Sequence, residues 1–216
     1  MSRPGLACLA WPLVSVWVAG CQTPPPAPGS APRPSVVVEE AEPWRRVASA
    51  RHSGALDAVA PAWERALAAS RAAGLTRRVL AEGALLAPGA ALARAAPAPG
   101  TYRCRYVRLG MRRWTASAQA FCYVGVEGGQ LSLATELKGL RLGGYLWEPR
   151  NADRLVFLGA AVPAGGRNAP AYGDDPAEDS AGLVERIGEF RYRLVLPEPE
   201  PGAGLTIVDM VAAPRT

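Results

Sequence analysis

The chain has 216 residues, of which 49% are hydrophobic and 20% are charged. This length and composition fit one domain with extensions and exclude a chain that is disordered throughout. The net charge of +5 is small and its arginines are dispersed along the sequence, which argues against a nucleic-acid-binding protein.

Residues 1–20 have the pattern of a secretory signal peptide. Arg3 precedes an uncharged apolar stretch from Leu6 to Val18, which is too short to span a bilayer as a helix. The Val-Ala-Gly-Cys sequence that ends at Cys21 resembles the lipobox of bacterial lipoproteins, which implies cleavage before Cys21 and lipid attachment to its thiol. The alternative is an ordinary cleaved signal with a chance cysteine. We expect an exported protein, lipid-anchored on the periplasmic side of the bacterial envelope, and Gln22 after the cysteine favours the outer membrane.

Residues 21–43 are a proline-rich tether, which we expect to be extended and to hold a domain away from the membrane. Residues 44–86 carry apolar side chains at helical spacing, and Pro61 within this pattern predicts a kink or two helices. His52 is the only histidine, and we expect it on the solvated surface because no nucleophile-elbow motif accompanies it. Residues 87–100 form an alanine-, proline- and glycine-rich linker.

From residue 101 to 213 the apolar spacing changes from helical to the alternation of strands. Eight strand candidates follow one another without a long helix between them, bounded by glycine or proline turns. The pattern predicts an α+β protein, mainly antiparallel β, in which the helical segment precedes an eight-stranded meander and residues 44–213 form one folding unit. A small lipocalin-like barrel is preferred because closure removes exposed strand edges, and a β-sandwich is the alternative.

Cys104 and Cys122 are the two cysteines of the β region. A pair of cysteines in an oxidising compartment predicts a disulfide. Alternation places Cys104 on one face with Tyr102 and Cys122 on one face with Val124, so the two thiols can meet if these strands pair.

Two groups of charged residues are weak candidates for a binding site. One loop carries a cluster of four carboxylates: Asp174, Asp175, Glu178 and Asp179. The cluster could be a calcium-binding site, or a solvated turn whose acidic side chains cap a short helical turn. A second group is basic and aromatic: Arg103, Arg105, Arg112, Arg113 and Trp114. It could contact lipid phosphate or an acidic partner, or it could be the solvated face of a strand.

Six stretches together carry a family resemblance: PWRRVA (43–48), AEGALLAP (81–88), GTYRCRYVRLG (100–110), RLVFLGA (154–160), YGDDPAEDSAGLVERIGEFRYRLVLPEP (172–199) and LTIVDMV (205–211). They resemble an uncharacterised bacterial family, the domain of unknown function 4893. The resemblance extends from about Trp44 to Val211 and supports these domain limits and an exported location. It implies no activity, cofactor or catalytic residue.

The leading functional hypothesis is a non-enzymatic envelope lipoprotein that binds a small apolar ligand or a protein partner through its tethered β domain. Gly144 and Gly159 are expected to face the barrel interior and leave room for such a ligand. One alternative is an inhibitor of a protease or lysozyme, by analogy of fold alone. Another is an enzyme acting on envelope glycans through Glu185 and Asp209 as paired carboxylates. We expect no cofactor and no nucleic-acid partner.

Overall fold

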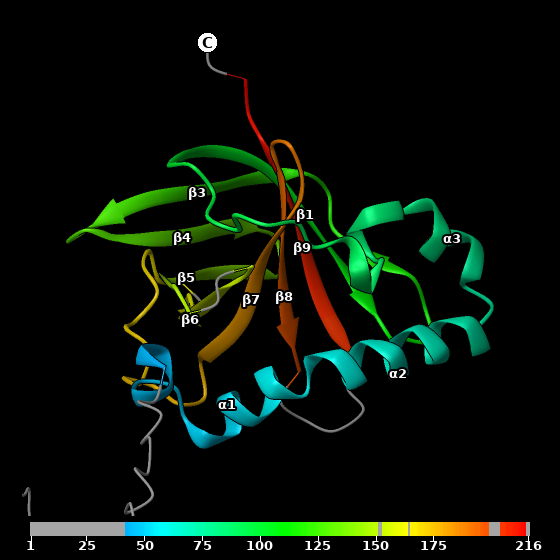
Figure 1. Cartoon of the computed structure of the whole chain (residues 1–216), viewed down its shortest axis with the longest axis horizontal. Helices are drawn as coiled ribbons and strands as arrows, with labels where there is room; N and C mark the ends of the chain where they lie inside the picture. The colour runs from blue at the N-terminus through cyan, green and yellow to red at the C-terminus, as the bar shows by residue number, and fades with distance from the viewer. Residues whose placement is uncertain (1–41, 151–152, 164, 199–203, 215–216) are drawn as a thin grey trace, which may run out of the picture. The chain divides into compact units, whose positions relative to one another are not determined.

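The computed structural model of the chain describes residues 42–150, 153–163, 165–198 and 204–214, which belong to one compact unit. The predicted signal peptide, Cys21 and the tether up to residue 41 lie outside the described residues. A group of short helices precedes a large antiparallel sheet (Figure 1). Over the described ranges, no helix has the length and apolar character needed to cross a membrane.

The helical part of the described chain consists of three 3-10 helices and three α-helices. These are η1 (Pro43–Arg46), α1 (Ala50–Asp57), α2 (Val59–Ala72), α3 (Thr76–Ala81), η2 (Gly83–Leu85) and η3 (Pro88–Ala90). Ser49 caps α1, since its Oγ accepts a hydrogen bond from the backbone N–H of His52 at 3.2 Å. The helical pattern divides at Ala58, and Pro61 lies in the first turn of α2, where a missing N–H breaks no helical hydrogen bond. Of the two predicted outcomes at Pro61, the structure therefore has two helices.

The sheet closes on itself. Its strands are β1 (Gly100–Leu109), β2 (Thr115–Ala116), β3 (Ala120–Glu127), β4 (Gln130–Leu137), β5 (Leu140–Trp147), β6 (Leu155–Ala161), β7 (Asp179–Gly188), β8 (Arg191–Pro197) and β9 (Leu205–Ala212). They pair in the order β2–β1–β3–β4–β5–β6–β7–β8–β9, and β1 also pairs antiparallel with β9. This last pairing makes an eight-stranded barrel of β1 and β3–β9, with β2 as a short extra strand. The predicted barrel is confirmed, and the sandwich alternative is wrong.

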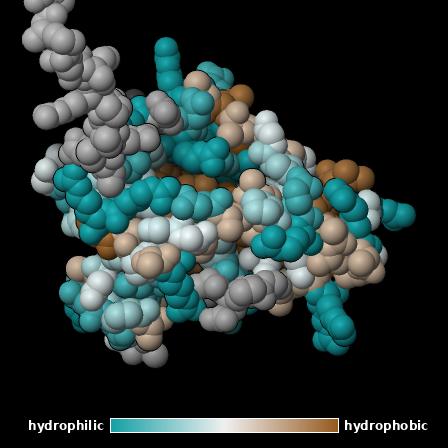
Figure 2. Space-filling model, turned by 60° about the horizontal axis from the view of Figure 1, so that its bottom comes forward, coloured by the Kyte–Doolittle hydropathy of each residue, from teal (hydrophilic) through white to brown (hydrophobic). Residues whose placement is uncertain are grey.

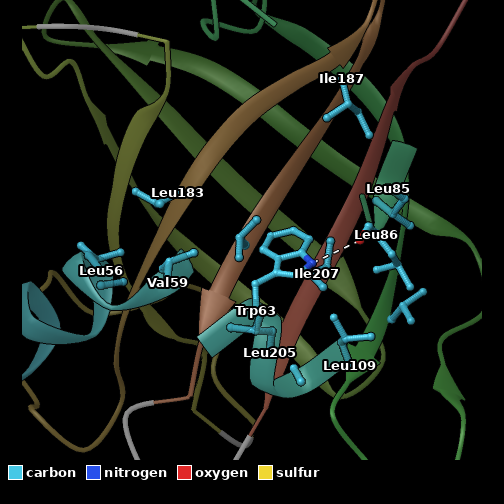
Figure 3. Close-up of a cluster of buried hydrophobic side chains, with 14 of the residues drawn as sticks. Leu56, Val59, Trp63, Leu85, Leu86, Leu109, Leu183, Ile187, Leu205 and Ile207 are labelled. Atoms are coloured by element: carbon cyan, nitrogen blue, oxygen red, sulfur yellow. Dashed lines mark hydrogen bonds between the residues drawn. The ribbon is translucent and has the colours of Figure 1, made fainter. Parts of the chain in front are cut away.

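Helices α1 and α2 run along one outer side of the barrel, beside β7, β8 and β9 (Figure 1). Trp63 of α2 lies between the helices and the sheet, among Val59, Ile207 and Leu86 (Figure 3). Its Nε1 donates to the carbonyl oxygen of Leu86 at 3.2 Å. Truncating a buried tryptophan to alanine costs about 3–5 kcal/mol, so this side chain is a principal contact between the helices and the barrel. On the outer face of the helices, hydrophobic side chains reach the surface only in separate small patches (Figure 2).

Apolar side chains also fill the inside of the barrel. They include Tyr102, Leu133, Phe157, Leu194 and Met210, all buried. The expectation that Gly144 and Gly159 leave room for a ligand is wrong. These glycines face each other across β5 and β6, and a Cβ on Gly159 would lie 2.2 Å from the carbonyl oxygen of Gly143 and 2.6 Å from Cζ of Phe157. The missing side chains allow a close approach of backbone and ring, so they leave no cavity.

The predicted disulfide is confirmed. Cys104 of β1 and Cys122 of β3 are bonded, with their Cα atoms 5.9 Å apart, and both side chains are fully buried inside the barrel. The bond joins the two strands at the base of the excursion that contains β2. A disulfide that closes a loop of this length contributes about 3 kcal/mol in the chain-entropy account.

Candidate functional site

A groove of about 510 Å³ lies on the outer face of β4 and β5, on a part of the barrel that α1 and α2 do not cover. Its floor includes Ser132 and Ala134 of β4 and Gly143 of β5, and residues 167–172 line it as part of the segment 165–172, here called the strap. A Cβ on Gly143 would lie 3.0 Å from Cβ of Ala169. The small residues of the floor therefore let the strap approach the sheet closely.

Arg141 of β5 holds one end of the strap. Its Nη1 and Nη2 donate to the backbone carbonyl oxygens of Gly166 and Arg167 at 3.1 and 3.4 Å. Its Nε donates to Oε2 of Glu136 on β4 at 3.0 Å, which orients the guanidinium. The side chains of Arg167 and Asn168 are exposed at this end of the groove and have no hydrogen-bond or ion-pair partner among the described residues.

Tyr172 holds the other end of the strap against α1. Its hydroxyl accepts from the backbone N–H of Ser49 at 3.0 Å and lies 2.6 Å from Nδ1 of His52. His52 is only 6% exposed, so the expectation of a solvated histidine is wrong. Burial lowers the pKa of His52, and the nearby charge of Asp179 opposes this shift only in part. A neutral His52 accepts at Nδ1 from the Tyr172 hydroxyl.

The acidic loop next to the strap forms the corner that positions Tyr172. Its aspartates accept hydrogen bonds from nearby backbone N–H groups: Asp174 from Ala171 at 3.2 Å, Asp175 from Ala177 at 3.1 Å, and Asp179 from Gly173 at 2.9 Å. The three aspartates thus stabilise the turns of this loop. No group of three or more His, Cys, Asp or Glu side chains that could hold a metal ion occurs among the described residues.

Tyr145 and Glu127 are at the opposite end of the groove from Arg167. The Tyr145 hydroxyl donates to Oε2 of Glu127 at 2.9 Å, and this hydrogen bond raises the pKa of Tyr145. The Tyr145 side chain is 38% exposed. The groove thus offers an oriented aromatic ring at one end and free hydrogen-bonding groups at the other.

The structure does not bring the predicted basic and aromatic group together. Arg105 is ion-paired with Glu82, and its Nη2 lies 3.4 Å from Oδ2 of Asp209. Its charge is therefore already paired and does not belong to a basic surface patch. Arg103 lies near the start of β1, while the exposed Arg112 and Arg113 follow its far end, roughly 20 Å away at the rise of a strand. The half-buried Trp114 packs against the core beneath the helices.

Glu185 and Asp209, the proposed catalytic pair, are buried in a row of alternating charges. Across β7, β8, β9 and β1 the register places Glu185, Arg193, Asp209 and Arg105 side by side. Asp209 accepts from Arg191 at 2.8 Å and Glu185 from Arg193 at 2.8 Å. Both carboxylates are thus ion-paired on the outer face of the sheet and do not line an open cleft.

Sequence reasoning missed Arg193, which is the most buried charged side chain among the described residues. It is 0% exposed, its guanidinium lies 4.5 Å from the ring centroid of Trp63, and burial lowers its pKa. Besides Glu185, it donates to four backbone carbonyl oxygens of the chain around η2 and η3: those of Ala84, Leu85, Ala87 and Pro88. An arginine between apolar neighbours in the stretch RYRLVLP was the available signal. The interactions show that Arg193 fastens the helical segment to the barrel.

Comparison with curated proteins and with solved structures finds no match to this chain. Comparison with protein families finds one matching family over residues 44–210, which include the helices, the groove and the charged row. The match covers most of the chain and agrees with the resemblance in the six stretches. The chain belongs to the family described as a domain of unknown function, DUF4893.

Proposed function

We propose that this protein is an exported lipoprotein of the bacterial envelope, and that its barrel is a non-enzymatic binding domain that contacts its ligand through the outer groove. The N-terminal sequence supports the anchor, since a secretory pattern ends in the lipobox-like sequence before Cys21. We expect the proline-rich tether, residues 21–43, to hold the domain away from the membrane.

The observation that carries the binding proposal is the contrast between the two faces of the barrel. Inside, Phe157, Leu194 and Met210 are fully buried in an apolar core, which leaves the interior without the room that a lipocalin-like carrier needs. Outside, the groove beside the strap is open and is lined by both polar and aromatic groups.

Fatty-acid labelling tests the anchor. In a bacterial host, the full chain should incorporate labelled palmitate, and the Cys21→Ser variant should not. A wild-type chain that is exported, cleaved and unlabelled contradicts the lipoprotein assignment.

Methyl-resolved NMR tests the binding face. The chain from Gln22 onward contains the whole compact unit, so it is suitable for titration with a soluble extract of the bacterial envelope. We expect signals of Ala134 and Ala169 in the groove to shift, while those of Leu194 and Met210 inside the barrel stay in place. Shifts confined to the interior methyl groups would contradict binding at the groove.

A further inference from the structure

The outer face around β4 has an arrangement of side chains that suits one class of ligand. Tyr123 of β3 and Tyr145 of β5 flank β4 on either side, and they are 46% and 38% exposed. In register, Tyr123 is opposite Ala134 and Tyr145 is opposite Ser132. Neighbouring strands are about 4.8 Å apart, and Ala134 and Ser132 are two residues apart along β4, so the backbones of the two tyrosines lie roughly 12 Å apart across a floor of small side chains.

We propose that this groove, together with Tyr123, binds a neutral oligosaccharide. The inference rests on the proposed function, since it names the ligand class of that same groove. The face of an aromatic ring is electron-rich and packs against the C–H groups of a pyranose ring. Two such rings beside Ser132 and Ala134, the part of the floor next to the strap, make a shallow surface on which successive sugar units can lie.

The rim of the groove supplies the hydrogen bonds that sugar hydroxyls need. A hydroxyl both donates and accepts, so it pairs equally with a carboxylate, an amide or a guanidinium. Glu127 and Tyr145 offer these groups at one end, and Asn168 and Arg167 offer them at the other. Arg141 and Tyr172 fix the strap from behind, which reduces the entropy lost when a ligand is bound.

The charge at the Tyr145 end of the groove selects against anionic groups there. Glu136 is neutralised by Arg141 at 3.0 Å. Glu127 has no cationic partner among the described residues and lies beside the exposed ring of Tyr145, whereas Arg167 is at the other end. A sulfate, phosphate or uronate placed on Tyr145 would be repelled by Glu127, so a neutral or N-acetylated sugar fits better.

Two other ligand classes fit the groove less well. An extended peptide gains much of its affinity by pairing with a free strand edge, but β4 and β5 are each paired on both sides. A small apolar ligand needs an enclosed apolar wall, whereas this groove is open and has glutamate, arginine and asparagine around it.

A glycan array is the first test. The fluorescently labelled chain from Gln22 onward is applied to neutral, N-acetylated, sulfated and uronic oligosaccharides at low ionic strength, where electrostatic discrimination is strongest. We expect binding to neutral or N-acetylated chains and at least tenfold weaker binding to their anionic counterparts. Absence of binding to every oligosaccharide overturns the proposal.

Calorimetry with the best tetrasaccharide of the array then locates the site. Tyr145→Ala should raise Kd at least tenfold, and Tyr123→Ala should raise Kd more for the tetrasaccharide than for the matching disaccharide. The control is Phe190→Ala, in the turn between β7 and β8, because Phe190 is a more exposed aromatic residue outside the groove lining and should change Kd less than twofold. Oligosaccharide binding that Tyr145→Ala leaves unchanged overturns this site.

The NMR titration with envelope extract separates the two failures. If the groove methyl groups respond to the extract while every oligosaccharide fails, the ligand class is wrong and the proposed function stands. If interior methyl groups respond and those of the groove do not, the proposed function fails, and this inference fails with it.

Discussion

Replacing Glu185 by glutamine removes the one negative charge bonded to the guanidinium of Arg193. Arg193 is 0% exposed, and its Nε and Nη2 lie 2.8 and 2.7 Å from Oε2 of Glu185. Removing one partner of a buried ion pair costs about 3–5 kcal/mol, because the remaining charge stays buried without its counter-charge. For a domain of this size each kcal/mol lowers Tm by about 2–4 °C, so Glu185→Gln should lower Tm by roughly 6–20 °C.

Urea denaturation at pH 7, followed by circular dichroism, measures this loss in the free energy of unfolding. Glu136→Gln is the matched control, because Glu136 pairs with Arg141 at a similar distance of 3.0 Å but both side chains are more than one-third exposed. Exposed pairs contribute at most about 1 kcal/mol. If the two variants lose the same free energy, the role assigned to Arg193 in fastening the helices to the barrel is refuted.

The remaining predictions concern single contacts. Because the pKa of His52 is lowered in the folded state, the unfolded chain binds a proton at this residue first as the pH decreases. The free energy of unfolding should therefore fall below about pH 6.5. Tm values measured from pH 8 to 5.5 should show this slope, and His52→Gln should flatten it. Cys104→Ser should lower the free energy of unfolding by about 3 kcal/mol in oxidising buffer, to the value of the reduced wild type. Equal Tm values for the oxidised wild type and the variant would contradict the stabilising role of the disulfide. Gly159→Val should prevent native folding, since its Cβ would lie 2.2 Å from a backbone oxygen, whereas Gly54→Ala in α1, with nothing within 4 Å, should raise the free energy of unfolding by up to about 1 kcal/mol. Thermal denaturation measures both variants, and a well-folded Gly159→Val would contradict the close approach of β5 and β6.

Features that depend on local spacing were predictable from the sequence. Alternating apolar residues indicated the strands, and the shared face of Cys104 and Tyr102 indicated where the disulfide would point. Pro61 indicated the break between two helices, because its ring and missing N–H are tolerated only in a first turn. Closure of the barrel was inferred from strand count, and the pairing of β1 with β9 bears it out.

Features that depend on distant contacts were not predictable. His52 and Tyr172 are 120 residues apart, and nothing in the local sequence of either one indicates that they share a hydrogen bond. The same holds for Arg193 and the carbonyl groups near Leu85, which lie 108 residues away in the sequence. Gly159 was placed on the correct face, but its packing against Phe157 depends on how closely β5 and β6 approach. These contacts belong to tertiary structure, which periodicity alone does not specify.

The position of the groove follows from a difference in side-chain pattern around the barrel. Apart from the charged row, outward positions on β6–β9 include apolar residues such as Val156, Val195 and Ile207, which are buried in the core beneath the helical segment. Outward positions on β4 and β5 instead include small residues, as at Ala134 and Gly143, which bury little area and give no helix a reason to pack there. In the described part of the chain the strap covers that side, and it is held by specific hydrogen bonds rather than by an apolar layer. The same sequence pattern that directs the helices to one side of the barrel therefore leaves the other side open to a ligand.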